Sequence, residues 1–466
     1  MEDISKLKSS LRRNEDTRRD DNRVIWWPER ILGPPPGLKQ LNVFCWAAFI
    51  AFVVVPVCIS VWYRLRAGYG FDFVYFYGLG RLASEWPIVN LYNVSAQLKL
   101  FSEISPLRQG YYSPSPYPPF VALFFALFAW LSFRGAYVAW MVVSLLLYST
   151  GIVSTIKRAF SGEGLQGSLL LCFCLAYPPF LLFTLVNGQL ASVAVCAIGL
   201  AAYQESRGNA FWSGVLLSAL AYKPTLLLVL VPMLILTRKF RAFYGLVTGT
   251  FTLIAASTAL AGVGIWPEYV RLVHVFRQLT AGQASGLPGH FKRWQFVDLN
   301  SLSYAIPGGR SGLGLLILIG LATAAYSWLA ILLWKSAYGG TAVQSLVWAS
   351  TLICTLLFNV YAPIYDSSIA AIAVILTLGA LKDLRWNNAA RWYMVAAFLT
   401  FAVAWKTVDI AEVHGIQLLT IMLLILMVSQ LVFLRQLVHG RTPQDMAEPH
   451  ERRAANFRTM PANSPH

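Results

Sequence analysis

The chain has 466 residues, of which 57% are hydrophobic and only 12% charged, and its formal net charge is +16. This composition, with several apolar runs long enough to cross a bilayer, predicts an all-α polytopic membrane protein and excludes an ordinary soluble domain. The positive charge comes without a basic helix or aromatic strand motif of a nucleic-acid-binding protein. We therefore expect no nucleic-acid partner and assign the charge to cytosolic loops that orient the protein.

Residues 1–40 are hydrophilic and contain acidic side chains, and the first apolar run begins at Leu41. This order is not that of a cleaved signal peptide, so we expect a cytosolic tail. All six cysteines lie inside apolar runs. We expect them to be small core residues, not disulfide partners or metal ligands.

The apolar runs predict twelve membrane spans, at residues 41–63, 136–155, 168–186, 189–203, 208–222, 224–237, 244–263, 313–334, 341–360, 366–381, 391–406 and 414–434. A further run at residues 120–133 is too short, because about fourteen helical residues rise only about 21 Å and the hydrocarbon core is about 30 Å thick. We expect this run to form a helix that lies in the membrane interface.

The positive-inside rule tests that choice, because one more span would invert every later loop. With the run excluded, the short outer loops hold two basic residues, Lys223 and Lys406, against ten in the short cytosolic loops: Lys157, Arg158, Arg207, Arg238, Lys239, Arg241, Lys335, Lys382, Arg385 and Arg391. We therefore expect a multi-pass protein of the cytoplasmic (inner) membrane with both termini in the cytosol. Its single transmembrane domain covers residues 41–435, and residues 436–466 form a disordered cytosolic tail.

Two outer segments are long, at residues 64–135 and 264–312, and long loops in a compact bundle are usually functional. The first contains Asp72 in an aromatic stretch, Gly70-Phe71-Asp72-Phe73-Val74-Tyr75-Phe76-Tyr77. A carboxylate at a membrane boundary, beside rings of the kind that stack on sugars, fits a general base that takes a proton from a sugar hydroxyl. The alternative is that Asp72 only caps the helix that follows it.

Cations on the same face are candidates to bind a phosphate and to stabilise its charge as a leaving group. Lys223 ranks first because it sits at the bilayer edge, although it could also extend to the interface without a function. Arg81 in the first long segment and His290, Lys292 and Arg293 in the second are the other candidates. No metal or other cofactor is required; a Ca²⁺ site formed by Asp72 with Asp298 or Asp366 stays an open alternative.

Several short motifs occur in an order that resembles a known family. They are Asp72 with its aromatic run and Gly78, Tyr117-Pro118-Pro119, Asn187-Gly188-Gln189, Lys223-Pro224, Asn300-Ser301-Leu302, and Pro363 with Tyr365-Asp366. The set resembles the polyprenyl-phosphate-sugar-dependent transferases of the GT-C superfamily, and within it glycosyltransferase family 87, which includes mycobacterial mannosyltransferases. The resemblance covers most of residues 41–435.

The resemblance implies a GT-C-like bundle that moves a hexose or pentose, with inversion, from a polyprenyl-phosphate donor to a lipid or glycan acceptor on the extracytoplasmic face. It also implies that Asp72 is the catalytic base, and it makes Tyr75, Tyr117, Asn187, Gln189, Asn300, Tyr365 and Asp366 candidates for contacts with the sugar or the acceptor. The mycobacterial members carry histidines near the position of Pro363, where this chain has Tyr365-Asp366-Ser367. Mannose as the sugar, and the identity of the acceptor, are therefore less firmly implied than the reaction.

Two alternatives belong to other classes of protein. A secondary transporter or flippase would show related halves and charged residues at mid-membrane, whereas this chain shows no internal repeat and its long loops share one face. A non-catalytic membrane scaffold would tolerate the loss of Asp72 and Lys223.

Overall fold

The computed structural model describes residues 38–69, 71–85, 88, 90–105, 112–160, 164–280, 293–305, 312–382 and 388–439. By its contacts the chain divides into two units, Met1–Ala48 and Phe49–His466. Of the first unit the structure describes residues 38–48, which form all but the last residue of helix α3, and the features below lie in the second unit. Within the described residues there is no β-sheet, and a single isolated bridge joins Phe296 to Pro363.

The first half of the chain is a succession of helices with two π-helical turns, η1 and η3, and two 3₁₀ turns, η4 and η5. In order they are α3 (Leu38–Phe49), η1 (Ile50–Val54), α4 (Val55–Arg66), α5 (Phe73–Ser84), α6 (Val94–Ile104), α7 (Pro119–Ala126), α8 (Phe133–Ala159), α9 (Gly164–Leu175), α10 (Pro178–Phe180), η3 (Leu181–Val186), α11 (Ala191–Ser206), α12 (Ala210–Leu217), η4 (Ser218–Tyr222), η5 (Pro224–Leu226) and α13 (Leu227–Leu236).

The second half continues in the same way, with two 3₁₀ turns. Its elements are α14 (Phe240–Ala261), α15 (Ile265–Thr280), η6 (Arg293–Gln295), α16 (Leu299–Ala305), α17 (Gly312–Lys335), α18 (Thr341–Leu357), η7 (Ile364–Ile369), α19 (Ala370–Lys382), α20 (Asn388–Val403), α21 (Thr407–His414) and α22 (Leu418–His439).

Six helical stretches are long and apolar enough to cross a membrane, or up to eight if each of two bent helix pairs counts as one span. These eight coincide with eight of the twelve predicted spans. The other four correspond to shorter apolar helices, three of which lie at Ala210–Tyr222, Pro224–Leu236 and Thr341–Leu357, and the fourth is α11. The protein is thus an all-helical, multi-pass membrane protein, whereas twelve full spans stay a prediction.

The region between Ala210 and Leu236 is the most irregular of the predicted spans. Helix α12 passes into the 3₁₀ turn η4, and a second 3₁₀ turn, η5, precedes α13, which contains Pro232. A proline inside a helix removes one backbone hydrogen bond and bends the helix. Lys223 lies at the joint between the two 3₁₀ turns.

The helix expected at residues 120–133 is shorter than its apolar run. Helix α7 ends at Ala126, and a new helix, α8, begins at Phe133. The Ser132 side chain accepts a hydrogen bond from the backbone N–H of Gly135, which starts α8 at that point. Apolar composition does not mark such a boundary, so the predicted helix extended too far.

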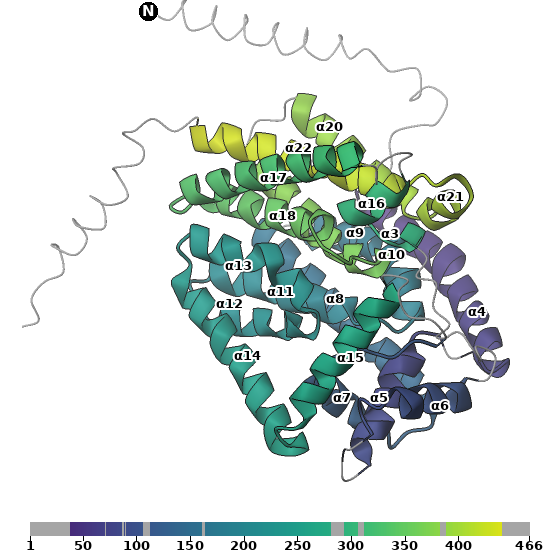
Figure 1. Ribbon diagram of the computed structural model, residues 1–466. Coiled ribbons are helices and arrows are strands. Elements are labelled where there is room, and N and C mark those ends of the chain that lie inside the picture. Colours follow the sequence, from purple (N-terminus) through teal and green to yellow (C-terminus); the bar gives the residue numbers. More distant parts are fainter. Residues whose placement is uncertain are drawn as a thin grey trace, which may run out of the picture. The chain divides into compact units, whose positions relative to one another are not determined.

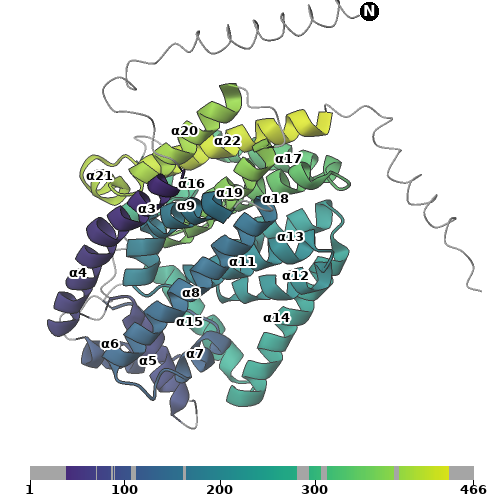
Figure 2. The same cartoon turned by 180° about the vertical axis from the view of Figure 1, so that it is seen from behind.

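Helices α8 and α11 pack side by side (Figures 1 and 2). At their crossing, a Cβ added to Gly199 would lie 2.2 Å from the carbonyl oxygen of Gly151. Only glycine allows the two backbones to approach this closely, a common way for helices to associate in membranes. The neighbouring helices α18 and α19 are almost wholly buried and form the centre of the core.

In both views α5, α6 and α7 gather at one end of the second unit, and α17, α20 and α22 lie at the other (Figures 1 and 2). Helices α5 and α7 pack closely: the backbone of Gly80 in α5 touches Phe125 in α7, where a Cβ would meet the carbonyl oxygen at 2.3 Å. Asp72 stands at the beginning of α5. The core of the bundle therefore positions the start of this helix.

Candidate functional site

Asp72 follows a residue with a strained backbone. Phe71 has a φ of +51°, in the left-handed region that costs an aromatic residue on the order of 1–3 kcal/mol. The Phe71 side chain is completely buried and its ring stacks on that of Tyr137, with 5.1 Å between the ring centroids. This packing holds the strained conformation, a feature that is found most often at functional sites.

The Asp72 carboxylate makes no capping hydrogen bond to α5. Instead its Oδ2 accepts a hydrogen bond from Nε2 of Gln189, at 3.1 Å, across 117 residues of chain. The residue is half-buried. The structure thus brings together two residues that the sequence analysis took from separate motifs.

Gln189 is presented by a tight turn before α11. Gly188 in this turn has a φ of +76°, and a Cβ there would lie 2.7 Å from the Cβ of Phe73. The carbonyl oxygen of Gly188 accepts a hydrogen bond of 3.0 Å from the indole N–H of Trp140 in α8. Since Phe73 directly follows Asp72, the close approach at Gly188 is what places Gln189 within reach of the carboxylate.

Lys223 forms an ion pair and hydrogen bond with Asp366 Oδ2 across 143 residues of chain. Its Nζ also lies 5.0 Å from the ring centroid of Tyr361 and 5.3 Å from that of Tyr365, in the range of cation–π contacts. The Lys223 side chain is 12% exposed and that of Asp366 is 0% exposed. Lys223 is therefore enclosed by an acid and two rings in this structure.

Tyrosines connect the two acids. Tyr117 lies beside Tyr365 and interacts electrostatically with both Asp366 and Asp72. Burial first, and then the negative charges of these acids, raise the pKa of Tyr117 above its ordinary value of 10.0. The pKa of Tyr361 is raised by burial and by interactions with Tyr117, Asp366 and Asp72. Both phenols therefore stay protonated at neutral pH and can donate hydrogen bonds.

We call this group the polar cluster; it consists of Asp72, Tyr75, Tyr117, Gln189, Lys223, Tyr361, Tyr365 and Asp366. Tyr75 belongs to it through its interactions with Tyr117 and Tyr361. Two buried acceptors in the cluster, Asp366 Oδ1 and Gln189 Oε1, have no hydrogen-bond partner among the described residues. A buried polar atom without a partner costs about 1–3 kcal/mol, which a polar ligand would offset.

Other residues expected at the site lie elsewhere or are not described. Arg81 is exposed near the opposite end of α5, about 13 Å along the helix from Asp72. Asn300 is exposed and its amide lies 3.4 Å from the carbonyl oxygen of Val360, and Asn187 is half-buried in the same turn as Gln189. Arg293 begins the turn η6; His290 and Lys292 lie outside the described residues.

The acids considered as Ca²⁺ ligands have other partners. Both carboxylate oxygens of Asp298 accept hydrogen bonds, from Ser301 and Ala362, and Asp366 is paired with Lys223. In the part of the chain that the structure describes, no group of three or more His, Cys, Asp or Glu side chains is placed to hold a metal ion.

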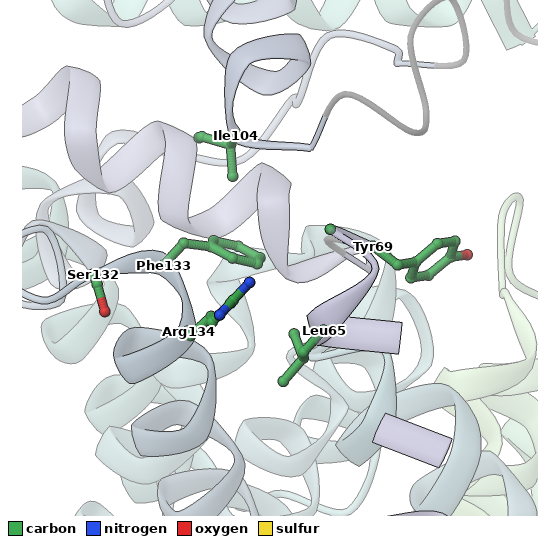
Figure 3. A pocket seen from close by; sticks show the side chains of 7 residues that line it. Leu65, Tyr69, Ile104, Ser132, Phe133 and Arg134 are labelled. Atoms are coloured by element: carbon green, nitrogen blue, oxygen red, sulfur yellow. The ribbon is translucent and has the colours of Figure 1, made fainter. Parts of the chain in front are cut away.

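An open hollow of about 440 Å³ lies beside the start of α5, between the end of α4, the end of α6 and the start of α8 (Figure 3). The side chains of Phe133 and Arg134 point into it. The ring of Phe133 is 5.8 Å from that of Phe73, so one layer of aromatic side chains separates the hollow from the neighbours of Asp72. None of these lining residues is among the predicted site residues.

Two features of the cluster were missed in the sequence. Tyr361 belongs to the motif Tyr361-Ala362-Pro363-Ile364-Tyr365-Asp366, yet only its last two residues were expected to contact a ligand. Tyr361 and Tyr365 are four residues apart and flank Pro363. This spacing was the signal in the sequence that could have identified Tyr361. The sequence held no signal for the backbone strain at Phe71, because a phenylalanine gives no indication of a positive φ.

Comparison with known proteins gives one match. The model of glycosyltransferase family 87 matches residues 116–359. That range contains Tyr117, Gln189 and Lys223, whereas Asp72 and Asp366 lie outside it. No curated protein and no solved structure matches the chain.

Proposed function

Since the chain belongs to glycosyltransferase family 87, we propose that this membrane glycosyltransferase moves a hexose or pentose from a polyprenyl phosphate to a lipid or glycan acceptor, with Asp72 as the general base. The observation that carries the proposal is the polar cluster, in which an accessible carboxylate and an enclosed lysine share the same tyrosines. A base and a cation in one cluster are what this transfer needs.

The side of the membrane that the cluster faces determines which type of sugar donor can reach it. We propose that twelve spans cross the inner membrane, that both termini are cytosolic and that the cluster faces the opposite compartment. Nucleotide sugars are absent there, so the activated sugar would arrive on a lipid carrier. The exposed apolar surface of the spans allows a prenyl chain to remain in the bilayer while its phosphate reaches the cluster.

The reaction is a single displacement. Asp72 takes the proton of the acceptor hydroxyl while the acceptor oxygen bonds to the anomeric carbon on the face opposite the phosphate. The bond between that carbon and the phosphate oxygen breaks, and polyprenyl phosphate departs with the electron pair. The proton remains on Asp72, and the anomeric configuration is inverted.

Asp72 suits the role of base better than Asp366. Asp366 is 1% exposed and paired with Lys223, so an acceptor hydroxyl has little access to it. Asp72 is half-buried and held by the amide of Gln189. A general base must come within hydrogen-bond distance of the proton that it removes.

Lys223 would stabilise the negative charge that develops on the leaving phosphate. The described part of the cluster has two carboxylates and one lysine, so its own charge is unfavourable for a phosphate. A further cation would therefore be expected from the basic residues of the second long segment, His290, Lys292 and Arg293. Tyr117, Tyr361 and Tyr365 would contact the sugar ring.

The test is transfer in proteoliposomes. Purified protein is given a panel of polyprenyl-phosphate sugars that includes mannose, arabinose, galactose and glucose, and the release of free polyprenyl phosphate is followed. We expect release with at least one donor, and mannose is the first choice because of the resemblance to mannosyltransferases.

Asp72→Asn is expected to lower turnover by about 10²–10⁴-fold, the usual contribution of a general base, and to leave donor binding intact. The matched control is Asp409→Asn, which alters an exposed acid paired only with Lys406 on the surface. Turnover of Asp72→Asn equal to that of the control would remove Asp72 from the mechanism.

A further inference from the structure

We propose that Asp298 is a positioning residue, which holds the loop that encloses Lys223 in its working geometry. The proposal rests on the proposed function, because it gives the second long segment a role at the same site. Asp298 touches no reacting group; it acts through the loop at residues 359–366, which carries Tyr361, Tyr365 and Asp366.

The contacts of Asp298 join two distant parts of the chain. The side chain is completely buried. Its Oδ1 accepts a hydrogen bond of 2.7 Å from the backbone N–H of Ser301, and its Oδ2 accepts one of 3.1 Å from the Ser301 hydroxyl. Oδ2 also accepts a hydrogen bond of 3.0 Å from the backbone N–H of Ala362, across 64 residues.

Further contacts join the same two parts of the chain. The backbone N–H of Val297 donates to the carbonyl oxygen of Ala362 at 2.8 Å. Phe296 forms an isolated β-bridge with Pro363, and its ring centroid lies 4.7 Å from that of Tyr361. The segment around Asp298 therefore contacts the loop at Tyr361 and at the two residues that follow it, beside the rings that surround Lys223.

The other side of the loop is tied to the turn that carries Lys223. The side-chain amide of Asn359 lies 3.4 Å from the carbonyl oxygen of Thr225, and its Oδ1 accepts a hydrogen bond of 3.0 Å from the backbone N–H of Tyr361. The loop is thus held between the Asp298 segment and the Lys223 turn. Asp298 supplies the charged group on one side of the loop, and the ion pair between Lys223 and Asp366 supplies charged groups on the other.

Loss of the carboxylate would leave the backbone N–H of Ala362, a fully buried residue, without its acceptor. Tyr361 is the preceding residue, so its ring would move relative to Lys223 Nζ. A displacement of about 1 Å at a catalytic group costs as much as about 10²-fold in rate. We expect Asp298→Ala to lower kcat by about 10–100-fold, with a smaller change in KM for the donor.

The experiment compares Asp298→Ala, Ser301→Ala and Ser303→Ala in the full-length protein. Ser301→Ala removes only the hydroxyl donor to Asp298 and should have a milder effect. It keeps the test valid if Asp298→Ala does not fold. Ser303 is the matched control, because its buried hydroxyl bonds within α16, to the carbonyl oxygen of Asn300, and not to Asp298 or the loop.

Two readouts are needed: kcat and KM for the donor, and the rate at which a water-soluble amine reagent acetylates Lys223, followed by mass spectrometry. The acetylation rate requires no activity, so it separates this proposal from the proposed function. We expect Lys223 in Asp298→Ala to be acetylated several-fold faster than in wild type, at a melting temperature close to that of Ser303→Ala.

Unchanged acetylation and unchanged kcat in Asp298→Ala and Ser301→Ala would overturn the positioning role and leave the transferase intact. Faster acetylation of Lys223 in a protein that transfers no sugar would support the positioning role and reject the proposed function.

Discussion

A largely buried ion pair lies near each end of helix α11, and the two pairs differ in how completely their acids are bonded. Near its end, Glu205 accepts a hydrogen bond from Lys239 on Oε1, at 2.6 Å, and one from the Trp348 indole on Oε2, at 2.7 Å. Near its start, Asp366 is bonded to Lys223 through Oδ2, and its Oδ1 has no partner among the described residues.

We propose that this difference separates an ion pair that stabilises the fold from one that binds a ligand. Both oxygens of Glu205 are used within the protein, and Arg158 adds a second cation nearby, although Arg158 Nε is itself without a partner in the described chain. The cluster at the start of α11 keeps unused acceptors on Asp366 and Gln189. At this cluster a polar ligand would satisfy both acceptors, which is why we place the site here.

Removal of each pair as a whole tests this comparison most strongly. Lys223→Met combined with Asp366→Asn removes the first pair without leaving a buried charge unpaired, and we expect kcat to fall by about 10²–10³-fold, as when one electrostatic contact to the transition state is lost. Lys239→Met combined with Glu205→Gln is the matched variant, for which we expect a lower melting temperature and a kcat within a few-fold of wild type. Equal effects of the two double variants on kcat would contradict the distinction.

Gly188→Ala sharpens the comparison by disturbing only the start of α11. The added Cβ would lie 2.7 Å from that of Phe73, at a φ of +76°. We expect Gln189 to move away from Asp72 and kcat to fall by about 10-fold or more, because misplacement of about 1 Å costs up to 10²-fold. Gly415→Ala is the control: Gly415 has a φ of +71° and open space around it, so it should lose some stability but no activity. A normal kcat for Gly188→Ala would show that the turn does not hold the base.

Acidification is expected to give the smallest effect, and it tests the ion pair between Glu205 and Lys239. Burial raises the pKa of Glu205, but the charges of Lys239 and Arg158 outweigh it and bring the pKa below its ordinary value of 4.5. A lowered pKa gives stability that is fully present above pH 4.5 and is lost as the pH falls through the folded-state pKa. We expect the melting temperature of Glu205→Gln to fall less than that of wild type on acidification below pH 4.5. The exposed acid Glu412, changed to Gln, serves as control, and parallel curves for wild type and Glu205→Gln would contradict the expectation.

Much of the helical architecture could be predicted, because an apolar run long enough to span a bilayer is visible residue by residue. Each predicted span coincides with a helix or a bent helix pair. The joint at Lys223 falls between two predicted spans, at residues 208–222 and 224–237. The π-helical turn η3 could not be predicted, because it lies inside the predicted span at residues 168–186 and its sequence is as apolar as that of a regular helix. The short α7 shows the same limit, since the run at residues 120–133 continues past the end of the helix.

The candidate site, too, could be predicted only in part. Polar residues at the ends of apolar runs are conspicuous, which is why Asp72, Gln189, Lys223 and Asp366 could be named. Their pairing could not, because Asp72 meets Gln189 and Lys223 meets Asp366 only through contacts across more than one hundred residues. Arg81 is close to Asp72 in sequence, but the two residues lie near opposite ends of α5.

The anomeric configuration of the product tests the central claim most directly. Wild-type protein in proteoliposomes is given a polyprenyl-phosphate sugar of known configuration that supports turnover, and the glycoside is analysed by NMR. A single displacement with Asp72 as base predicts complete inversion and no sugar attached to the protein. Retention of configuration, or a covalent sugar on Asp72, would contradict the account, because Asp72 would then be a nucleophile.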